Sequence, residues 1–229
     1  MSVVRARLGA VLLVLGLAAC TADSGLTATR TGSTEIRLTW PAAPDTALGQ
    51  VLEYRNQAGG EFTELAFLPA NATSYTHSEL IPRTDFYYRV RTVFGRESTS
   101  VAVALPTGSG PAAPEGDWAA PRSRPSSPGP HNSLRDKENS GAGPTDLHAE
   151  AVGTDGVHLS WTDHARDEDG YLLEVTPANG SAVRVAAVLG PGVNEVGVYP
   201  LEQEHTASYR VAAFYYGQTS SVAHETTGA

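Results

Sequence analysis

The 229-residue sequence has a single cysteine, Cys20, and a single lysine, Lys137. One cysteine excludes an intrachain disulfide and a cysteine-based metal site, so each folded unit depends on its apolar core alone. The net charge is -9. Because nucleic-acid binding needs an excess of basic residues to displace counterions, this charge argues against a nucleic-acid partner.

Long apolar runs are also missing. The longest, from Leu8 to Leu17, has roughly ten residues, whereas a bilayer-spanning helix needs about 20. Arg5 and Arg7 precede it and the small residues Ala18 and Ala19 follow it. A basic start, a short apolar stretch and a small-residue exit are typical of a secretory signal peptide, predicted here for residues 1–19.

Leu17-Ala18-Ala19-Cys20 resembles the lipobox of bacterial lipoproteins. The resemblance implies cleavage before Cys20 and a lipid on its sulfur, with residues 20–24 as a short tether. Two or three acyl chains hold a protein firmly at a membrane, whereas one does so only marginally. We therefore expect an exported protein on the outer face of the bacterial cell membrane, or on the outer membrane if there are two.

The rest of the chain repeats itself around a segment rich in Pro, Gly and Ser. Residues 108–143 show no period of 2 or 3.6, which predicts a flexible linker. On either side, an offset of 121 maps the first half onto the second, for example Trp40 onto Trp161 and Tyr88-Arg89-Val90 onto Tyr209-Arg210-Val211. The repeat predicts two copies of one domain, residues 25–107 and 144–229.

Apolar and polar residues alternate with period 2 in both copies. Ile36, Leu38 and Trp40 share one face of an expected strand, as do the matching residues Val157, Leu159 and Trp161. Many short strands without a sustained helical stripe predict an all-β fold of antiparallel sandwiches.

The Leu-x-Trp strand, the Leu80-x-Pro82-x-Thr84 segment and the Tyr-Arg-Val strand resemble a fibronectin type III domain. The resemblance covers about residues 25–107 and 145–228 and implies two immunoglobulin-like sandwiches of seven strands, each with a buried Trp between its sheets. The sequence departs from the family at the corner tyrosine, which is Phe86 in copy one and Ala207 in copy two. Gln50 also stands where an inward aromatic is usual.

Catalytic motifs are missing: there is no HExxH, GxSxG or GxxxxGK[ST]. The signal, sandwiches and linker also account for the whole length. We therefore expect no enzyme and no cofactor.

Four neighbouring acids, Asp163, Asp167, Glu168 and Asp169, are the candidate calcium ligands. Their spacing does not match an EF-hand loop, and the family resemblance places them in a solvent-facing loop, so they are weak metal candidates. The seven histidines are scattered, and we interpret His148 and His158 as surface residues and not as a metal pair.

The connection before the last strand is short in both copies, at Phe94-Gly95-Arg96 and Tyr216-Gly217-Gln218, which predicts tight hairpins. Phe214 and Tyr216 are then expected to point outward beside the second hairpin. Such a pair is a candidate binding site for a sugar ring or a protein, although outward aromatics also pack against a neighbouring loop.

The favoured hypothesis is a non-catalytic surface lipoprotein that meets the membrane through Cys20 and presents two modules to an envelope protein or polysaccharide. The short tether places copy one against the membrane, and the linker lets copy two search beyond it. The alternatives are a passive spacer or scaffold, and an accessory to a polysaccharide-processing enzyme.

Overall fold

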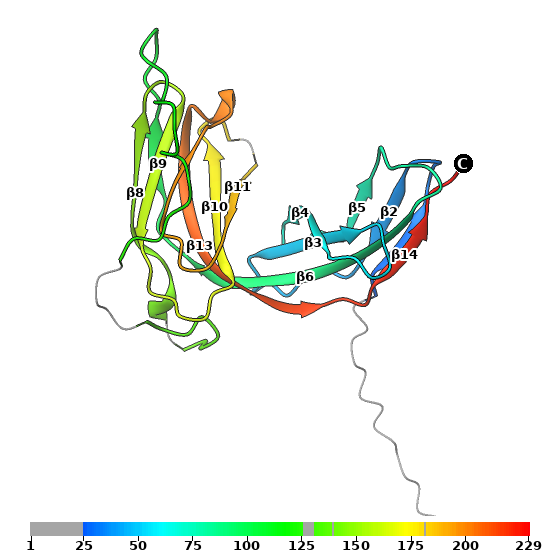
Figure 1. The fold of residues 1–229 in the computed structure, drawn as a ribbon. Coiled ribbons are helices and arrows are strands. Elements are labelled where there is room, and N and C mark those ends of the chain that lie inside the picture. Colours follow the sequence, from blue (N-terminus) through cyan, green and yellow to red (C-terminus); the bar gives the residue numbers. More distant parts are fainter. Residues whose placement is uncertain (1–24, 126–130, 139, 181) are drawn as a thin grey trace, which may run out of the picture.

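The computed structural model describes residues 25–125, 131–138, 140–180 and 182–229 (Figure 1). These residues form fourteen β-strands and two single-turn 3-10 helices, which confirms the expected all-β class. The strands of copy one are β1 (Thr27–Arg30), β2 (Ile36–Thr39), β3 (Gly49–Arg55), β4 (Thr63–Leu68), β5 (Ser74–His77), β6 (Asp85–Glu97) and β7 (Val101–Ala104).

The second half repeats this order. It contains η1 (Ser140–Ala142), β8 (Thr145–Val152), β9 (Gly156–Thr162), β10 (Gly170–Pro177), β11 (Arg184–Leu189), β12 (Glu195–Val198), η2 (Glu202–Glu204), β13 (Thr206–Thr219) and β14 (Ala223–Thr226).

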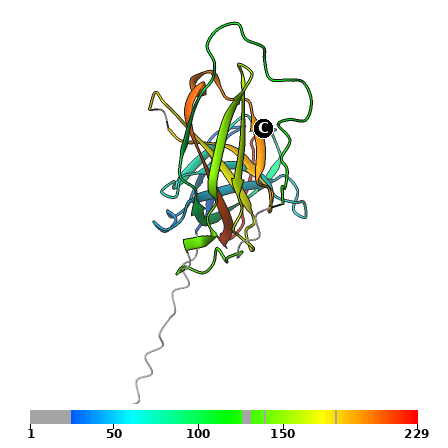
Figure 2. The same cartoon turned by 90° about the vertical axis from the view of Figure 1, so that its left-hand side faces the viewer.

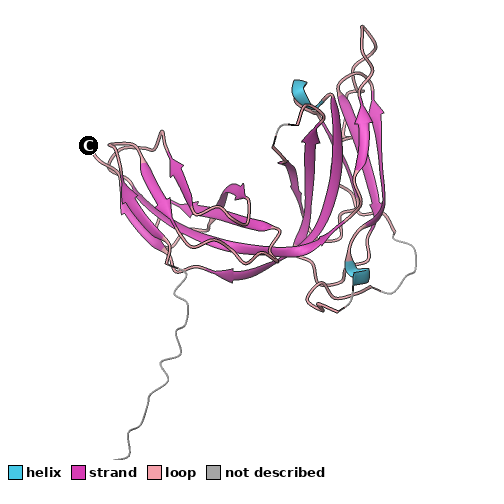
Figure 3. Ribbon diagram, turned by 180° about the vertical axis from the view of Figure 1, so that it is seen from behind, coloured by secondary structure: helices cyan, strands magenta, loops and turns pink. Residues whose placement is uncertain are grey.

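Three sheets build two sandwiches. One outer sheet has the order β1-β2-β5 and the other β12-β9-β8. Between them, a single eight-stranded sheet follows the path β11-β10-β13-β6-β3-β4, with β14 added to β6 and β7 added to β13. Figure 3 shows the two sandwiches set at an angle, with the long strands running from one into the other.

The last strand of each copy completes the other copy. β7 pairs with β13, so that Val101 lies opposite Tyr209, and β14 pairs with β6, so that Ala223 lies opposite Tyr88. We call β1–β6 with β14 the first sandwich, and β8–β13 with β7 the second. The chain therefore exchanges equivalent strands within itself.

The two joints of this exchange match each other bond for bond. Ser98 N donates to Val211 O at 2.8 Å, and Ser220 N donates to Val90 O at 2.8 Å. Each serine hydroxyl also accepts the amide of the same partner residue, at 3.1 Å for Ser98 Oγ and 2.9 Å for Ser220 Oγ. The exchange is thus a pseudo-twofold, isologous contact, which is the arrangement expected when like surfaces meet.

Each sandwich has its own core around the predicted tryptophan. In the first, Trp40 packs with Ile36, Leu38, Leu52 and Tyr88. The second core contains Trp161, Leu159 and Leu173, together with Leu105 from copy one. The apolar faces of the alternating strands therefore lie inside, as their period predicts.

A third apolar cluster joins the two sandwiches. It contains Val51, Val93, Leu172, Ala212 and Phe214, all at most 3% exposed. These residues point away from the two sandwich cores, so a face that is solvated in an isolated sandwich is buried here.

The expected tight hairpins are wrong. Phe94 and Gly95 lie inside β6, and Tyr216 and Gly217 lie inside β13, where Gly95 pairs with Phe214 and Phe94 with Tyr215. Glycine at position 95 lets the main chains of β6 and β13 approach closely, because a Cβ at Gly95 would overlap the Ala213 carbonyl oxygen. The strands continue because a partner strand, and not a turn, satisfies their main chain.

The expected flexible linker is also wrong over the described parts of residues 108–143. The indole Nε1 of Trp118 donates to the Tyr199 hydroxyl at 3.0 Å, and Leu134 is 4% exposed within the second core. Figure 2 shows the connection after β7, in green, looping over the end of the second sandwich. Further along, Asp136 O and Lys137 O accept Arg96 Nη2 of β6 at 3.4 Å and 3.1 Å. Because the described linker residues are bound to both sandwiches, the linker does not let copy two search freely.

Candidate functional site

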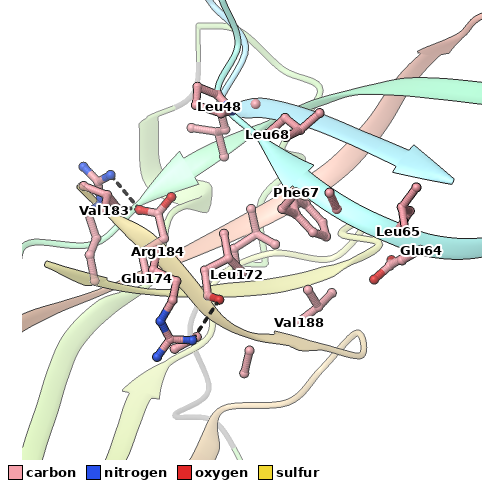
Figure 4. Close-up of a pocket in the computed structure, with 17 residues that line it drawn as sticks. Leu48, Glu64, Leu65, Phe67, Leu68, Leu172, Glu174, Val183, Arg184 and Val188 are labelled. Atoms are coloured by element: carbon pink, nitrogen blue, oxygen red, sulfur yellow. Dashed lines mark hydrogen bonds and ion pairs between the residues drawn. The ribbon is translucent and has the colours of Figure 1, made fainter. Parts of the chain in front are cut away.

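The candidate site is a groove between β4 and β11, the two edge strands of the eight-stranded sheet (Figure 4). Its cavity volume is about 690 Å³. Most of its lining is apolar, with Leu48, Leu65, Phe67 and Leu68 on one side and Leu172, Val183, Val185 and Val188 on the other. We call this cavity the inter-sandwich groove.

Equivalent bulges shape both walls of the groove. The pairing of β3 with β4 shifts between Leu52 and Glu53, and that of β10 with β11 shifts between Leu173 and Glu174. These positions are related by the repeat offset of 121. A bulge bends its strand and increases the local twist, so both edges are turned in the same manner by the same local feature.

The charged side chains of the groove are satisfied within the protein. Arg210 Nη2 lies 2.6 Å from Glu174 Oε2, and Arg184 Nη2 lies 2.7 Å from Glu204 Oε2. Glu64 Oε1 accepts the Tyr216 hydroxyl at 3.0 Å. With these charges paired, the groove offers apolar contact and main-chain edges, a surface suited to binding and not to acid–base chemistry.

Phe214 does not form the expected exposed binding pair, because it is 1% exposed in the third cluster. Its ring meets the Phe67 ring edge-on at 6.4 Å. Tyr216 is half-buried, and the Arg91 guanidinium lies 3.2 Å from its ring centroid. Burial and the Glu64 carboxylate raise the pKa of the Tyr216 hydroxyl. The pair supports the wall of the groove from behind.

The acids near residue 163 bind protein donors. Asp163 accepts the Tyr171 hydroxyl and the Ala165 amide. Asp167 accepts Ser133 Oγ at 2.6 Å and Leu134 N at 2.7 Å, while Asp169 accepts Tyr216 N at 2.7 Å. These acids cap turns and fasten the linker.

Two of the acids have shifted pKa values. Partial burial opposes ionisation of Asp167, but hydrogen bonds from Ser133, Leu134 and Arg135 outweigh it and lower the pKa of this carboxyl. Burial raises the pKa of Glu168, and the nearby Asp163 acts in the same direction. The sign differs because Asp167 has several donors around it, whereas burial dominates at Glu168.

Nothing in the described part of the chain gathers three or more metal-binding side chains. His148 is exposed, as expected, but His158 is not a solvated surface residue, since its side chain is 17% exposed. His158 Nε2 lies 2.9 Å from Glu195 Oε1. It belongs to a buried polar network beneath the linker.

The lipidation prediction at Cys20 lies outside the described residues. Within the described ranges no helix has the length and apolar character needed to cross a membrane.

The third cluster behind the groove was missed at the sequence level, although a signal for it exists. Val51-Leu52 and Leu172-Leu173 are adjacent apolar pairs in equivalent strands. Because neighbouring side chains point to opposite faces, such a pair predicts that both faces of the strand are covered. Leu52 and Leu173 fill the sandwich cores, and Val51 and Leu172 fill the third cluster.

Two solved structures are similar to part of this chain. A solved Fn3-like protein from Clostridium thermocellum is 32% identical over 31% of this chain and 72% of its own, with a TM-score of 0.28. The FN3 domain of human collagen XX is 27% identical over 31% of this chain and 73% of its own, also with a TM-score of 0.28. No curated protein is similar to the chain.

The family comparison covers one copy of the repeat. Residues 22–104 match the fibronectin type III domain family, a range that includes β7, the strand given to the second sandwich. The chain therefore contains a fibronectin type III domain at residues 22–104.

Proposed function

We propose that this protein is a non-catalytic bacterial surface lipoprotein, anchored through Cys20, whose two fibronectin type III modules bind an envelope protein or polysaccharide. The fibronectin type III domain at residues 22–104 carries the proposal, since this module suggests a binding or scaffold role. The location rests on the Leu17–Cys20 sequence and on Cys20 being the only cysteine.

The second module is proposed from the repeat and from strand order. β8–β13 follow the order of β1–β6, and both copies bury a tryptophan at matching positions. Because β7 lies in the second sandwich, a fragment that begins at residue 144 lacks one strand of that sandwich. The unit proposed to function is therefore the joined pair of sandwiches.

The inter-sandwich groove is the proposed contact surface for the envelope partner. Val183 and Val188 are 53% and 39% exposed on its rim, an unusual exposure for apolar side chains that line a cavity. Burial of these side chains by a partner would contribute favourable free energy in proportion to the apolar area covered.

A passive scaffold is the second candidate, and the strand exchange favours it. The antiparallel pairing of β6 with β13 holds the sandwiches together through main-chain bonds and the third cluster. A joined pair of this kind sets a defined distance between its two ends.

In-cell crosslinking of the full chain, with and without Val183→Lys and Val188→Lys, tests the binding role. We expect the unaltered chain to be crosslinked to a discrete partner. The two groove variants should lose this partner, although their urea unfolding midpoints should equal that of the unaltered chain. A partner retained by both variants would remove the groove from the proposal, and the absence of any partner would favour the scaffold. Activity on cell-wall polymers would instead support the enzyme-accessory alternative.

Anchoring is tested separately by metabolic labelling with a radioactive fatty acid. We expect label on the unaltered chain and its recovery with membranes, and neither for Cys20→Ala. Membrane recovery of Cys20→Ala at the unaltered level would contradict the anchor.

A further inference from the structure

The connection between β7 and β8 is much longer than its task requires. β7 and β8 lie in contact in the second sandwich, yet residues 105–144 separate them. Connections within compact domains usually take about 4–6 residues, and much longer ones are usually functional or disordered. Here the described part of the connection is bound to the second sandwich, which it both leaves and enters, and Leu105, Leu134 and Ala142 reach the core of that sandwich.

Residues 117–124, which we call the strap, lie along the outer edge of β12 and pair with it through an isolated antiparallel bridge between Arg122 and Glu195. Arg122 N donates to Glu195 O at 2.9 Å, and Arg122 O accepts Asn194 N at 3.0 Å. The Asn194 side chain, in a residue 5% exposed, accepts Arg124 N at 2.7 Å and donates to Arg124 O at 3.1 Å. This is the main-chain pattern by which an extended peptide is recognised at a sheet edge.

The strap also places the Trp118 ring in a slot whose floor is formed by Gly156 and Gly197. A Cβ at Gly156 would lie 2.6 Å from the Trp118 ring, and one at Gly197 would overlap it. Tyr199 closes the slot, with ring centroids 5.2 Å apart and edge-on geometry. Any side chain at either glycine would fill the space that the indole occupies.

A buried carboxylate receives the strap's cations. Glu195 is 2% exposed, and its side chain pairs with Arg124 and lies 3.9 Å from Arg122. His158 is the other neighbour, at 2.9 Å. Because a buried charge is costly unless it is well paired, this edge favours an occupant that supplies a cation.

The strap lies on the surface and its site lies beneath it. None of residues 117–124 is buried, whereas Asn194, Glu195 and Val196 are at most 5% exposed. No strap residue belongs to the three hydrophobic clusters. Removing the strap from its site therefore leaves the described cores intact.

A second cavity continues from the strap along the same face. Its volume is about 570 Å³, and it runs from Ala119 and Pro121 to β11 and β12. Val188, Tyr199 and Leu201 line it and are 39%, 57% and 46% exposed. Exposed apolar residues gathered beside a peptide-bearing edge mark a surface that fits a longer ligand than the strap.

We propose that the strap is an internal occupant of a peptide-recognition site on β12. The partner is a protein segment in extended conformation, with an aromatic residue followed four and six residues later by arginines, and it displaces the strap. The biological use of this site rests on the proposed interaction role, but binding of a peptide to β12 does not depend on anchoring. No residue of β12 lines the inter-sandwich groove, although Val188 borders both cavities.

The test uses a fluorescent peptide with the sequence of residues 116–125 and the full chain in which Trp118, Arg122 and Arg124 are changed to Ala. Fluorescence anisotropy should show saturable binding at least tenfold tighter to this released variant than to the unaltered chain, since the internal competitor is gone. Adding Gly197→Ala should abolish binding, whereas Gly190→Ala, a glycine with open space around it, should not.

A released variant that keeps the urea midpoint of its core but binds no peptide would overturn the proposal. Binding that persists in the Gly197→Ala variant would also overturn the proposal. So would binding of a peptide in which the tryptophan has been replaced. If the triple variant fails to fold, Trp118→Ala alone serves in its place, and unfolding of both would show that the strap is structural. In the unaltered chain, the Arg122 amide should exchange with solvent well before that of Val211.

Discussion

The two copies solve one packing problem in different ways at residues 50 and 171, which the repeat relates. In copy one, the buried Gln50 accepts Trp40 Nε1 at 2.8 Å and donates to Ala70 O at 2.8 Å and Ala72 O at 2.9 Å. In copy two, the equivalent Tyr171 packs its ring against Trp161 and donates its hydroxyl to Asp163.

This difference explains why a departure from the family pattern is compatible with the same fold. The Gln50 amide ties the core tryptophan to the segment that follows β4, so one side chain satisfies several buried groups. Tyr171 supplies apolar ring area and one hydroxyl, while Trp161 Nε1 has no protein partner in the described chain. The fold requires that the space is filled and that polar atoms are mostly paired; the residue type is secondary.

The exchange of β7 and β14 is the largest structural claim about the two copies, and a disulfide tests it directly. In a Cys20→Ser background, Ala102→Cys with Ser208→Cys should form a disulfide within the monomer, because these residues are opposite each other. Paired strand residues lie about 4.5–5.5 Å apart at Cα, within disulfide range.

The control for the disulfide test is Ala102→Cys with Tyr87→Cys, since Tyr87 is the repeat equivalent of Ser208. It should stay reduced if the strands are exchanged. A disulfide at 87–102, with none at 102–208, would show that each copy keeps its own last strand. Non-reducing peptide mapping reads both outcomes.

Gln50→Ala should be the most destabilising single substitution, by about 3–4 kcal/mol, because it leaves a cavity and several unpaired buried groups. Tyr171→Phe, which removes only a hydroxyl, should cost about 1–2 kcal/mol. Urea unfolding measures both. Equal losses would mean that the Gln50 network does no more for copy one than a single hydroxyl does for copy two.

Gly95→Ala should destabilise the junction of β6 and β13 by about 2–3 kcal/mol, since the added methyl meets a main-chain carbonyl and forces the strands apart. Gly59→Ala is the matched control because nothing lies within 4 Å of its Cβ position. Thermal unfolding followed by circular dichroism compares them. If Gly95→Ala were as stable as its control, the close pairing of the two sandwiches would be in doubt.

The smallest expected effect is a local pH dependence of the linker attachment in copy two. The folded-state pKa of Asp167 is lowered, so its contribution to linker attachment is present above the ordinary value of 3.8 and is lost as pH falls below it. The Leu134 amide, which donates to Asp167, should then lose protection from hydrogen exchange. Asp167→Asn should remove the pH dependence, and unchanged protection at pH 3 would contradict it.

Much of each sandwich was predictable from local pattern. The alternation at Ile36, Leu38 and Trp40, and at the matching residues of copy two, placed these side chains in the cores. The burial of Phe214 was not predictable, because its outward direction was inferred for an isolated sandwich and the residues that cover it come from the other copy. The contacts of the linker were missed because its proline-rich composition reports weak internal structure and not surface binding.

The sequence by itself determined the all-β class, the repeat, the buried tryptophans and the single cysteine in its lipobox-like setting, since these depend on period, spacing and composition. Only the tertiary structure decided which copy receives each final strand. β7 and β14 are equivalent and present similar main-chain bonds to either β6 or β13, so local preference does not separate the two pairings. The exchanged pairing is distinguished by the third cluster, which buries apolar residues that two separate sandwiches would leave facing water.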